Sequence, residues 1–451
     1  MVHRVPVQET VSPAKLAEPI TFPTSNRIAK NRFMKAALTE RVATWIPDDR
    51  KKCGFPTTDL CNMYEKLTHG GFGVLLSGNI AVDANHLESA GNVIIHHSID
   101  SPERREAFKC YAAAFKAGSD NLAIAQLSNA GRQTPRALVE HPISASDVQL
   151  LAMRRGCGYG KPRALTIEEI HKTVVHDFAY AAKYVYDSGF DGVQIHSAHG
   201  YLLAQFVSET TNKRTDQYGG SLKNRNRLNL EIYEAIRRLI PVETGFIVGI
   251  KMNSKEFQVD GLECDDAVYM CKEYERIGFD FIELSGGTIE KVAFQHLSES
   301  TISREAFFFE FSAKIKAVLT TIIVYLTGGF RTVHGMVKAI EQGACDGIGL
   351  GRPITAEIDL PAKILSGEVQ SAILNPYDQD YNISSNVSST QMWQAQQTPY
   401  NTEKGVNVGI MDINDEETAE KYKAELVKYN AKCFELSQAG VPIKGVLEFQ
   451  V

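Results

Sequence analysis

The chain alternates short apolar runs with longer stretches of helical periodicity over most of its length. Apolar runs of about four to eight residues are typical of buried strands, whereas apolar residues at three- and four-residue steps indicate helices. Eight strands alternating with helices are typical of a closed parallel barrel, so the pattern predicts an α/β fold, a (β/α)8 TIM barrel. The predicted strands are residues 33–38, 73–80, 122–127, 191–195, 247–252, 281–284, 322–326 and 347–350.

Three of the intervening helices are well marked, at residues 167–188, 225–240 and 265–277. Thr166 and Glu169 have the spacing of a capping box at the start of the first. An open doubly wound α/β sheet is the alternative to the barrel, but such a sheet usually has a glycine-rich fingerprint after its first strand. No such fingerprint follows the first predicted strand here. The barrel is therefore the favoured fold.

The pattern changes after the last predicted strand. We expect residues 1–365 to form the barrel and residues 366–451 to form a C-terminal helical extension. Residues 378–400 are polar and rich in Ser, Asn and Gln, which predicts a loop or an extended arm. An amphipathic helix follows, with Asn414 and Glu417 as its expected capping box. This helix packs on the barrel or forms the contact of a homodimer, and the sequence favours neither alternative.

Composition narrows the class of protein. The formal net charge is -6 and no basic stripe is present, which argues against a nucleic-acid partner. No apolar run reaches the roughly 18 residues of a membrane span, and no apolar signal region begins the chain. The 8 cysteines are scattered without a C-x-x-C pair, which predicts reduced thiols, a cytoplasmic protein and no metal site.

The fourth predicted strand leads directly into two imidazoles and a phenol. His196, His199 and Tyr201 stand at tight spacing on the turn after the strand, so they converge on one small volume. Three hydrogen-bond donors there suit a substrate carbonyl that gains negative charge during reaction. A single histidine is usually structural, but the H-x-x-H-x-Y spacing at the end of a strand favours a catalytic role. The helical zinc motif has two histidines four residues apart with a glutamate beside the first, and it is absent.

Glycine-rich turns end the seventh and eighth predicted strands. They read TGGF at 327–330 and GLGRP at 349–353. In TIM barrels the loops after these two strands frequently build a phosphate site. Gly329 and Gly351 allow backbone N–H groups to approach the anion closely, and Arg352 can bind it bidentately. We therefore expect a phosphate group at this side of the barrel mouth.

Several further segments add up to a specific pattern. They are NRFMKAALT at 31–39, QLSNAGR at 126–132, HSAHGY at 196–201 and NKRTDQYGGS at 212–221. With the two glycine turns, they resemble the Old Yellow Enzyme family of FMN-dependent oxidoreductases. The resemblance implies a barrel that holds FMN at its C-terminal mouth and takes hydride from NAD(P)H. It also implies an electron-poor alkene, conjugated to a carbonyl, as the substrate.

The resemblance assigns roles to the residues after the fourth strand. His196 and His199 polarise the substrate carbonyl, and Tyr201 donates a proton to the α-carbon. These roles make chemical sense, because donors aimed at a developing oxyanion lower the barrier. A phenol with an ordinary pKa of about 10 is also protonated at neutral pH, as a proton donor must be.

The resemblance also implies the flavin contacts. Gln126 binds the pyrimidine edge, Thr39 lies near O4 or N5, and the backbone around Ala37 and Asn79 touches the ring. Lys251 places positive charge near N1 and O2 and stabilises the reduced anionic flavin. Many relatives carry arginine at this position, and lysine cannot make the planar bidentate contact. This difference bears on the redox potential more than on FMN binding.

Three other functions stay open. A related flavin oxidase, desaturase or isomerase of secondary metabolism would use the same site and differ in its electron acceptor. A non-catalytic barrel that binds a phosphorylated ligand or a partner protein would leave the imidazole pair and the phenol without a function. A sugar-phosphate lyase or isomerase would need a metal carboxylate cluster or a Schiff-base lysine, and neither is evident.

Overall fold

The architecture was taken from a computed structural model of the chain. It describes residues 3–450 except 154–155, 257–258, 260, 287–289 and 291–300. Among the described residues, no helix combines the length and the apolar character that a membrane crossing requires. The 8 cysteines are free thiols.

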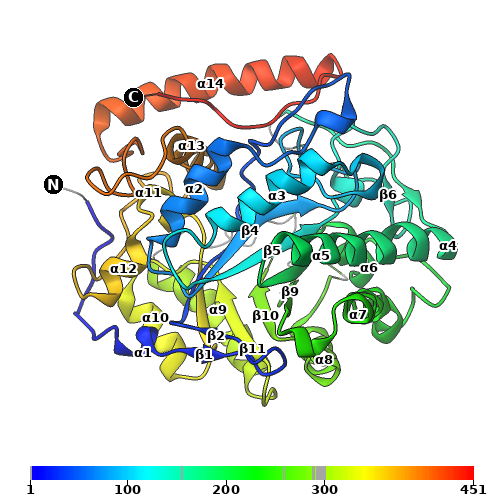
Figure 1. The fold of residues 1–451 in the computed structure, drawn as a ribbon, viewed down its shortest axis with the longest axis horizontal. Helices are drawn as coiled ribbons and strands as arrows, with labels where there is room; N and C mark the ends of the chain where they lie inside the picture. Colours follow the sequence, from blue (N-terminus) through cyan, green and yellow to red (C-terminus); the bar gives the residue numbers. More distant parts are fainter. Residues whose placement is uncertain are drawn as a thin grey trace.

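A closed barrel of parallel strands forms the centre of the molecule, with helices around it (Figure 1). Its strand order is β10-β11-β12-β3-β4-β5-β8-β9, so that the first and last strands along the chain pair and close the ring. The eight strands that the sequence predicted are all present, and the TIM-barrel prediction is confirmed. They are β3 (Phe33–Lys35), β4 (Val74–Ala81), β5 (Leu122–Ser128), β8 (Gly192–Ser197), β9 (Ile247–Asn253), β10 (Phe281–Ser285), β11 (Ile323–Thr327) and β12 (Gly347–Leu350).

The helices between these strands bury their apolar faces against the outside of the barrel, where a large hydrophobic cluster joins the two layers. The predicted helices 225–240 and 265–277 are confirmed with small shifts of their ends. The longer helices of this ring are α2 (Thr58–Thr68), α3 (Pro102–Ala114), α5 (His176–Ser188), α7 (Leu222–Leu239), α8 (Cys264–Ile277), α9 (Thr301–Lys316) and α10 (Val333–Glu341).

A small hairpin closes one end of the barrel. Strands β1 (Ile20–Thr21) and β2 (Ile28–Ala29) pair antiparallel, and Phe22 between them packs against Phe281 and Tyr325. This separate apolar cluster includes residues from the beginnings of the barrel strands, so it fills the N-terminal end. The opposite end of the barrel, where the strands end, is therefore the end at which a functional site can form.

The predicted helix 167–188 is divided in the structure. Its capping box is confirmed, because Thr166 accepts a hydrogen bond from the backbone of Glu169 and the Glu169 side chain accepts one in return. Only α4 (Ile167–Glu169) follows the cap as α-helix, and residues Ile170–Val175 then form π-helical turns. Helix α5 begins after them, at His176.

The expectation of a loop over 378–400 is wrong. These residues form helix α13 (Tyr381–Gln396), whose first turn is capped by the carboxylate of Asp380. The helix is polar yet largely buried, because its side chains find polar partners. Gln391 accepts a hydrogen bond from Thr355 at 2.8 Å, and Gln394 donates to the carbonyl of Phe449 at 2.9 Å. A buried helix of this kind has no apolar stripe that the sequence pattern could reveal.

The amphipathic C-terminal helix is present as α14 (Glu416–Gln438). Its cap is Asp415, which accepts from the Thr418 N–H, and not the expected Asn414 one residue earlier. The buried side chains Tyr422 and Leu426 pack in one cluster with Val387 of α13, and Figure 1 shows α14 along the outer edge of the molecule. A role for this helix in a homodimer, and the boundary at residue 365, stay predictions.

Candidate active site

The C-terminal mouth of the barrel contains a cavity of about 500 Å³. Cofactor and small-molecule pockets commonly enclose about 300–1,000 Å³, so the volume suits such a ligand. Its walls are formed by the ends of the barrel strands, the turns after them and helix α13. The catalytic and cofactor-binding residues that the sequence predicted all border it: Ala37, Thr39, Asn79, Gln126, His196, His199, Tyr201, Lys251, Gly329, Gly351 and Arg352.

The predicted catalytic trio lies at the end of β8. His196 belongs to the strand, and His199 and Tyr201 stand in the turn before α6 (Leu202–Val207). The backbone of His199 has φ of 57°, a left-handed conformation that residues other than glycine seldom adopt. The ring centroid of His196 lies 5.4 Å from that of His199 and 4.8 Å from that of Tyr201. The structure therefore brings the three rings together on one wall.

His196 is buried and neutral. Burial, with the charges that His199 and Lys251 can carry, holds the pKa of His196 well below its usual range. A neutral imidazole offers one N–H donor and one lone pair. Its Nδ1 atom is buried and has no hydrogen-bond partner among the residues that the structure describes. Buried polar atoms are nearly always paired, so this nitrogen at the cavity edge points to a ligand atom as its partner.

Both the ring and the backbone of His199 make polar contacts with neighbouring residues. Its Nε2 atom lies 2.9 Å from the hydroxyl of Ser285, which ends β10 and also borders the cavity. Its backbone N–H donates to the Asn253 side chain at 3.3 Å, and its carbonyl accepts from Gln133 at 2.7 Å. These contacts fix the left-handed turn and aim the ring. The sequence did not indicate Ser285.

A chain of buried hydrogen bonds crosses the barrel interior. Gln126 Nε2 donates to Gln194 Oε1 at 2.7 Å, and Gln194 Nε2 donates to Glu283 Oε2 at 2.8 Å. Lys251 Nζ donates to Glu283 Oε1 at 2.7 Å. Strand register produces this layer, because Gln126 stands opposite Gln194 and Lys251 opposite Glu283 in adjacent strands. The outer members, Gln126 and Lys251, border the cavity.

The glycine turns and Arg352 line another part of the same cavity. The loop after β11 passes through Gly329 with φ of 80°, which favours glycine there. Arg352 Nη1 donates to Ser384 Oγ at 2.7 Å and lies 3.4 Å from the carboxylate of Asp378. Arg331 pairs with the same carboxylate at 3.1 Å. The predicted phosphate-binding residues are thus together and held by contacts from the start of α13.

Helix α13 supplies a wall that the sequence did not predict. Small polar residues of this helix recur at three- and four-residue steps, which is the signal that could have revealed a helix face. The residues of α13 that border the cavity are Tyr381, Asn382, Ser385, Ser388, Ser389 and Met392.

A sequence model of the NADH:flavin oxidoreductase / NADH oxidase family matches residues 15–370. The chain belongs to this family. It is 42% identical over 390 residues to the NADH-dependent flavin oxidoreductase nadA of Aspergillus parasiticus, and the match covers 86% of each chain. The old yellow enzyme homologue of Zymomonas mobilis has a similar fold, with a TM-score of 0.66 and 22% identity, over 88% of this chain and 99% of that one.

A 2-naphthoyl-CoA reductase, solved as its 2-naphthoyl-CoA complex, also shares the fold. The TM-score is 0.70 with 22% identity, over 82% of this chain and 56% of that chain. The expectation of an Old Yellow Enzyme family member is confirmed. The protein is an oxidoreductase that uses FMN and a nicotinamide hydride donor.

The cavity of this flavin oxidoreductase fits FMN. Lys251 and Gln126 offer a cation and an amide to the polar edge of a ring system, and Arg352 with the glycine turns offers donors to a phosphate. Two buried atoms at the cavity support the fit. The hydroxyl of Thr327 and Nδ1 of His196 have no partner among the described residues, so each has a hydrogen bond to offer to a bound molecule.

Two residues of the interior network, Gln194 and Glu283, were not predicted from the sequence. Each is a polar residue in the middle of an otherwise apolar predicted strand. A buried polar group needs a partner, so both positions carried a detectable signal. Their partners depend on the register between strands, which one sequence does not specify.

Proposed function

We propose that this flavin oxidoreductase is an ene reductase, which reduces the C=C bond of α,β-unsaturated carbonyl compounds with hydride that originates in NADH or NADPH. The observation that carries the proposal is that His196, a buried imidazole with a lowered pKa and an unpartnered Nδ1, lies beside His199 and Tyr201 on one wall of the cavity. Such a group suits a ligand oxygen that gains charge without being protonated.

When bound, FMN would supply the hydride chemistry, which carries hydride from the nicotinamide to the β-carbon of the alkene. His196 and His199 donate hydrogen bonds to the carbonyl oxygen and stabilise the negative charge that it gains. Tyr201 gives its phenolic proton to the α-carbon, and solvent returns a proton to the phenolate. The alkene thus gains one hydride and one proton, and the nicotinamide is oxidised.

The remaining cavity residues would hold the cofactor. Gln126 and Lys251 would bind the pyrimidine part of the ring system, while Ala37, Thr39 and Asn79 would contact its other edge. Gly329, Gly351 and Arg352 would bind the phosphate, by backbone N–H groups and the guanidinium. A homodimer and a cytoplasmic location stay predictions.

The test separates the two half-reactions. The purified yellow protein is reduced anaerobically with NADH or NADPH, then mixed with 2-cyclohexen-1-one or with oxygen while flavin absorbance is followed. We expect the enone to reoxidise the flavin rapidly. Replacing His196 and His199 together by Ala removes both donors and should slow this step by about a hundredfold or more, since one oxyanion donor is commonly worth about 10²–10³.

The Tyr201→Phe variant should slow enone turnover but leave reduction by NADH unchanged. His334→Ala, at an exposed position whose side chain pairs with Glu9, is the matched control and should behave like the wild type. Reoxidation that is fast with oxygen, slow with every enone tried and insensitive to the histidine substitutions would contradict the proposal. That outcome would favour a related flavin oxidase.

A further inference from the structure

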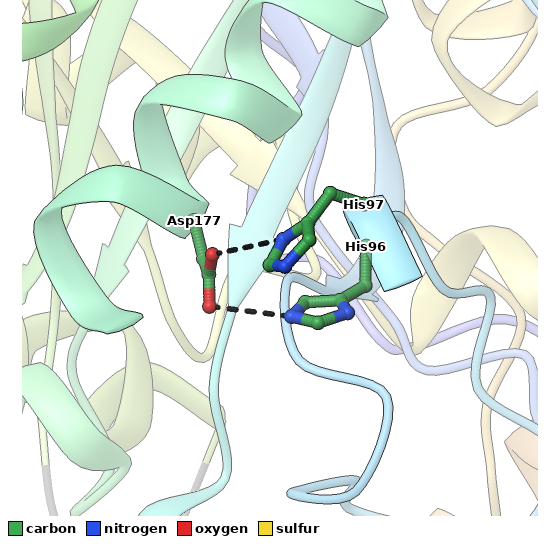
Figure 2. Close-up of side chains that lie close together, drawn as sticks. All are labelled: His96, His97 and Asp177. Atoms are coloured by element: carbon green, nitrogen blue, oxygen red, sulfur yellow. Dashed lines mark ion pairs between the residues drawn. The ribbon is translucent and has the colours of Figure 1, made fainter. Parts of the chain in front are cut away.

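Two adjacent histidines face a buried aspartate on the outside of the barrel, away from the flavin cavity. His97 opens the short helix η2 (His97–Ile99), which follows β4, and Asp177 lies in the first turn of α5. Figure 2 shows both rings turned toward the two carboxylate oxygens. His96 Nε2 lies 3.4 Å from Oδ2, and His97 Nδ1 lies 3.5 Å from Oδ1. We propose that these residues, the histidine–aspartate site, bind a divalent transition-metal ion, with zinc as the expected occupant.

The separations between the ligand atoms support an ion. They exceed the ordinary N–H···O distance of about 2.7–3.2 Å, so neither ring makes a good hydrogen bond to the carboxylate. Bonds of about 2.0–2.1 Å arranged tetrahedrally place ligand atoms about 3.3–3.4 Å apart. One ligand atom from each of the three residues lies within 4.8 Å of the others. The two short separations are to different carboxylate oxygens, so an ion held by one atom of each residue requires side-chain movements that bring atoms within 4.8 Å of one another to that spacing.

The buried negative charge of Asp177 also favours the binding of a cation. Its side chain is only 4% exposed, and a buried carboxylate is costly unless it is paired. Among the residues that the structure describes, its ion-pair partners are His96, His97 and His176, with no lysine or arginine. A divalent ion bound between the three residues would compensate this buried negative charge.

The neighbours of the three residues are arranged as in metal sites, where the ligands are themselves hydrogen-bonded. His96 Nδ1 lies 2.7 Å from the hydroxyl of Ser98 and 3.3 Å from its backbone N–H, and these contacts orient the ring with Nε2 toward Asp177. His176 Nδ1 lies 3.0 Å from Asp177 Oδ1 and can orient the carboxylate. The π-helical turns Ile170–Val175 directly precede this pair, and such turns often occur at functional sites.

The position of the site indicates its effect. An ion there would connect the segment after β4 to helix α5, two parts of the chain that lie 80 residues apart (97 to 177). The same segment carries Glu88, which pairs with Arg41, and both border the flavin cavity. His97 is half exposed, which leaves room for water as a further ligand. We therefore assign the ion a structural role in holding this segment in place.

Zinc binding to the flavin-loaded protein provides the test, first by equilibrium dialysis of Zn²⁺ after treatment with a chelator. The wild type should bind one more Zn²⁺ per chain than His97→Ala or Asp177→Asn, or bind it at least about tenfold more tightly. The matched control is His334→Ala, because His334 forms an ordinary surface pair with Glu9 at 2.8 Å. This variant should bind Zn²⁺ at the site like the wild type.

Thermal unfolding gives an independent readout, because a ligand that binds only the native state raises the Tm. Zn²⁺ should raise the Tm of the wild type and of His334→Ala, and raise that of His97→Ala much less. His97 is half exposed, so this variant should fold and keep its flavin even if Asp177→Asn does not. Equal Zn²⁺ stoichiometry and affinity in wild type and His97→Ala, or no binding in either, would overturn the proposal.

Discussion

Lys251 and Glu283 form a buried ion pair, with Nζ and Oε1 2.7 Å apart and both side chains at most 5% exposed. Lys251 borders the flavin cavity, whereas Glu283 lies behind it and also binds Gln194. The carboxylate therefore offsets part of the positive charge of Lys251. If Lys251 binds the flavin as proposed, the charge near the ring depends on a pair of residues and not on the lysine alone.

This pairing predicts opposite shifts of the flavin reduction potential in two variants. Glu283→Gln removes the compensating charge, so the potential should become more positive by about 30 mV, equivalent to about 1.4 kcal/mol for two electrons. Lys251→Met removes the cation and should make the potential more negative. Anaerobic spectroelectrochemical titration measures both.

Breaking a buried pair costs about 3–5 kcal/mol of stability, so FMN content and the unfolding midpoint should be measured alongside. Shifts of the same sign in the two variants would show that the carboxylate does not act through Lys251.

A second prediction concerns Ser285 and the orientation of His199. Ser285→Ala removes the hydroxyl 2.9 Å from His199 Nε2, which should lower kcat/KM for an enone by about threefold to tenfold, or about 1 kcal/mol. Reduction by NADH should change less, because it does not need a polarised carbonyl. Ser285→Thr keeps the hydroxyl and should restore most of the rate. Loss of both half-reactions to the same extent would indicate a general change in the cavity.

The barrel and the position of the residues after the fourth strand could be predicted from the sequence for one physical reason, whereas the flavin contacts were implied by the family resemblance. Buried parallel strands appear as short apolar runs, and the carboxyl ends of all barrel strands meet at the same mouth. Polar residues placed directly after such runs, as His199 and Tyr201 are, must therefore lie near one another. The two glycine turns were recognisable because their order along the chain put them after the last two strands.

The parts that could not be predicted depend on tertiary partners. Helix α13 is buried but polar, since groups such as Gln394 bond to distant backbone, here the carbonyl of Phe449. The interior network requires the strand register that sets Lys251 opposite Glu283. The histidine–aspartate site unites residues of separate segments, and neither segment carries a metal-binding spacing of its own.

The buried neutral state of His196 predicts how stability depends on pH. Because the folded pKa lies well below 6.5, the unfolded chain binds a proton near pH 6.5 that the native protein does not bind. The contribution of His196 to stability is therefore fully present above pH 6.5 and is lost as the pH falls toward the folded pKa.

Urea unfolding between pH 5 and pH 7.5 should show the free energy of unfolding falling below pH 6.5, with a slope from this residue of up to about 1.4 kcal/mol per pH unit. His196→Asn should lack that component, and the difference between the two curves isolates it. Parallel curves would mean that the pKa of His196 is the same in the native and the unfolded protein, so that burial does not hold this residue neutral as proposed.

Arg352 allows the phosphate site to be tested apart from the ring site. Arg352→Met should weaken FMN binding by about tenfold to a hundredfold, since a hydrogen bond to a charged group is worth about 1.5–3 kcal/mol. Riboflavin lacks the phosphate, so its affinity should stay near the wild-type value in the same variant. Fluorescence titration of the apoprotein with each ligand measures both, and Arg136→Met, on an exposed surface, is the matched control.

The comparison of FMN with riboflavin also distinguishes a phosphate contact of Arg352 from a role of Arg352 in supporting helix α13. Arg352 donates to Ser384 at the start of that helix, so its removal could disturb the cavity wall rather than a phosphate contact. Ser384→Ala breaks the same support but keeps the guanidinium, and it should leave the preference for FMN over riboflavin intact. If Arg352→Met weakens both ligands equally and Ser384→Ala does the same, the arginine positions α13, and the phosphate must bind to the glycine turns alone.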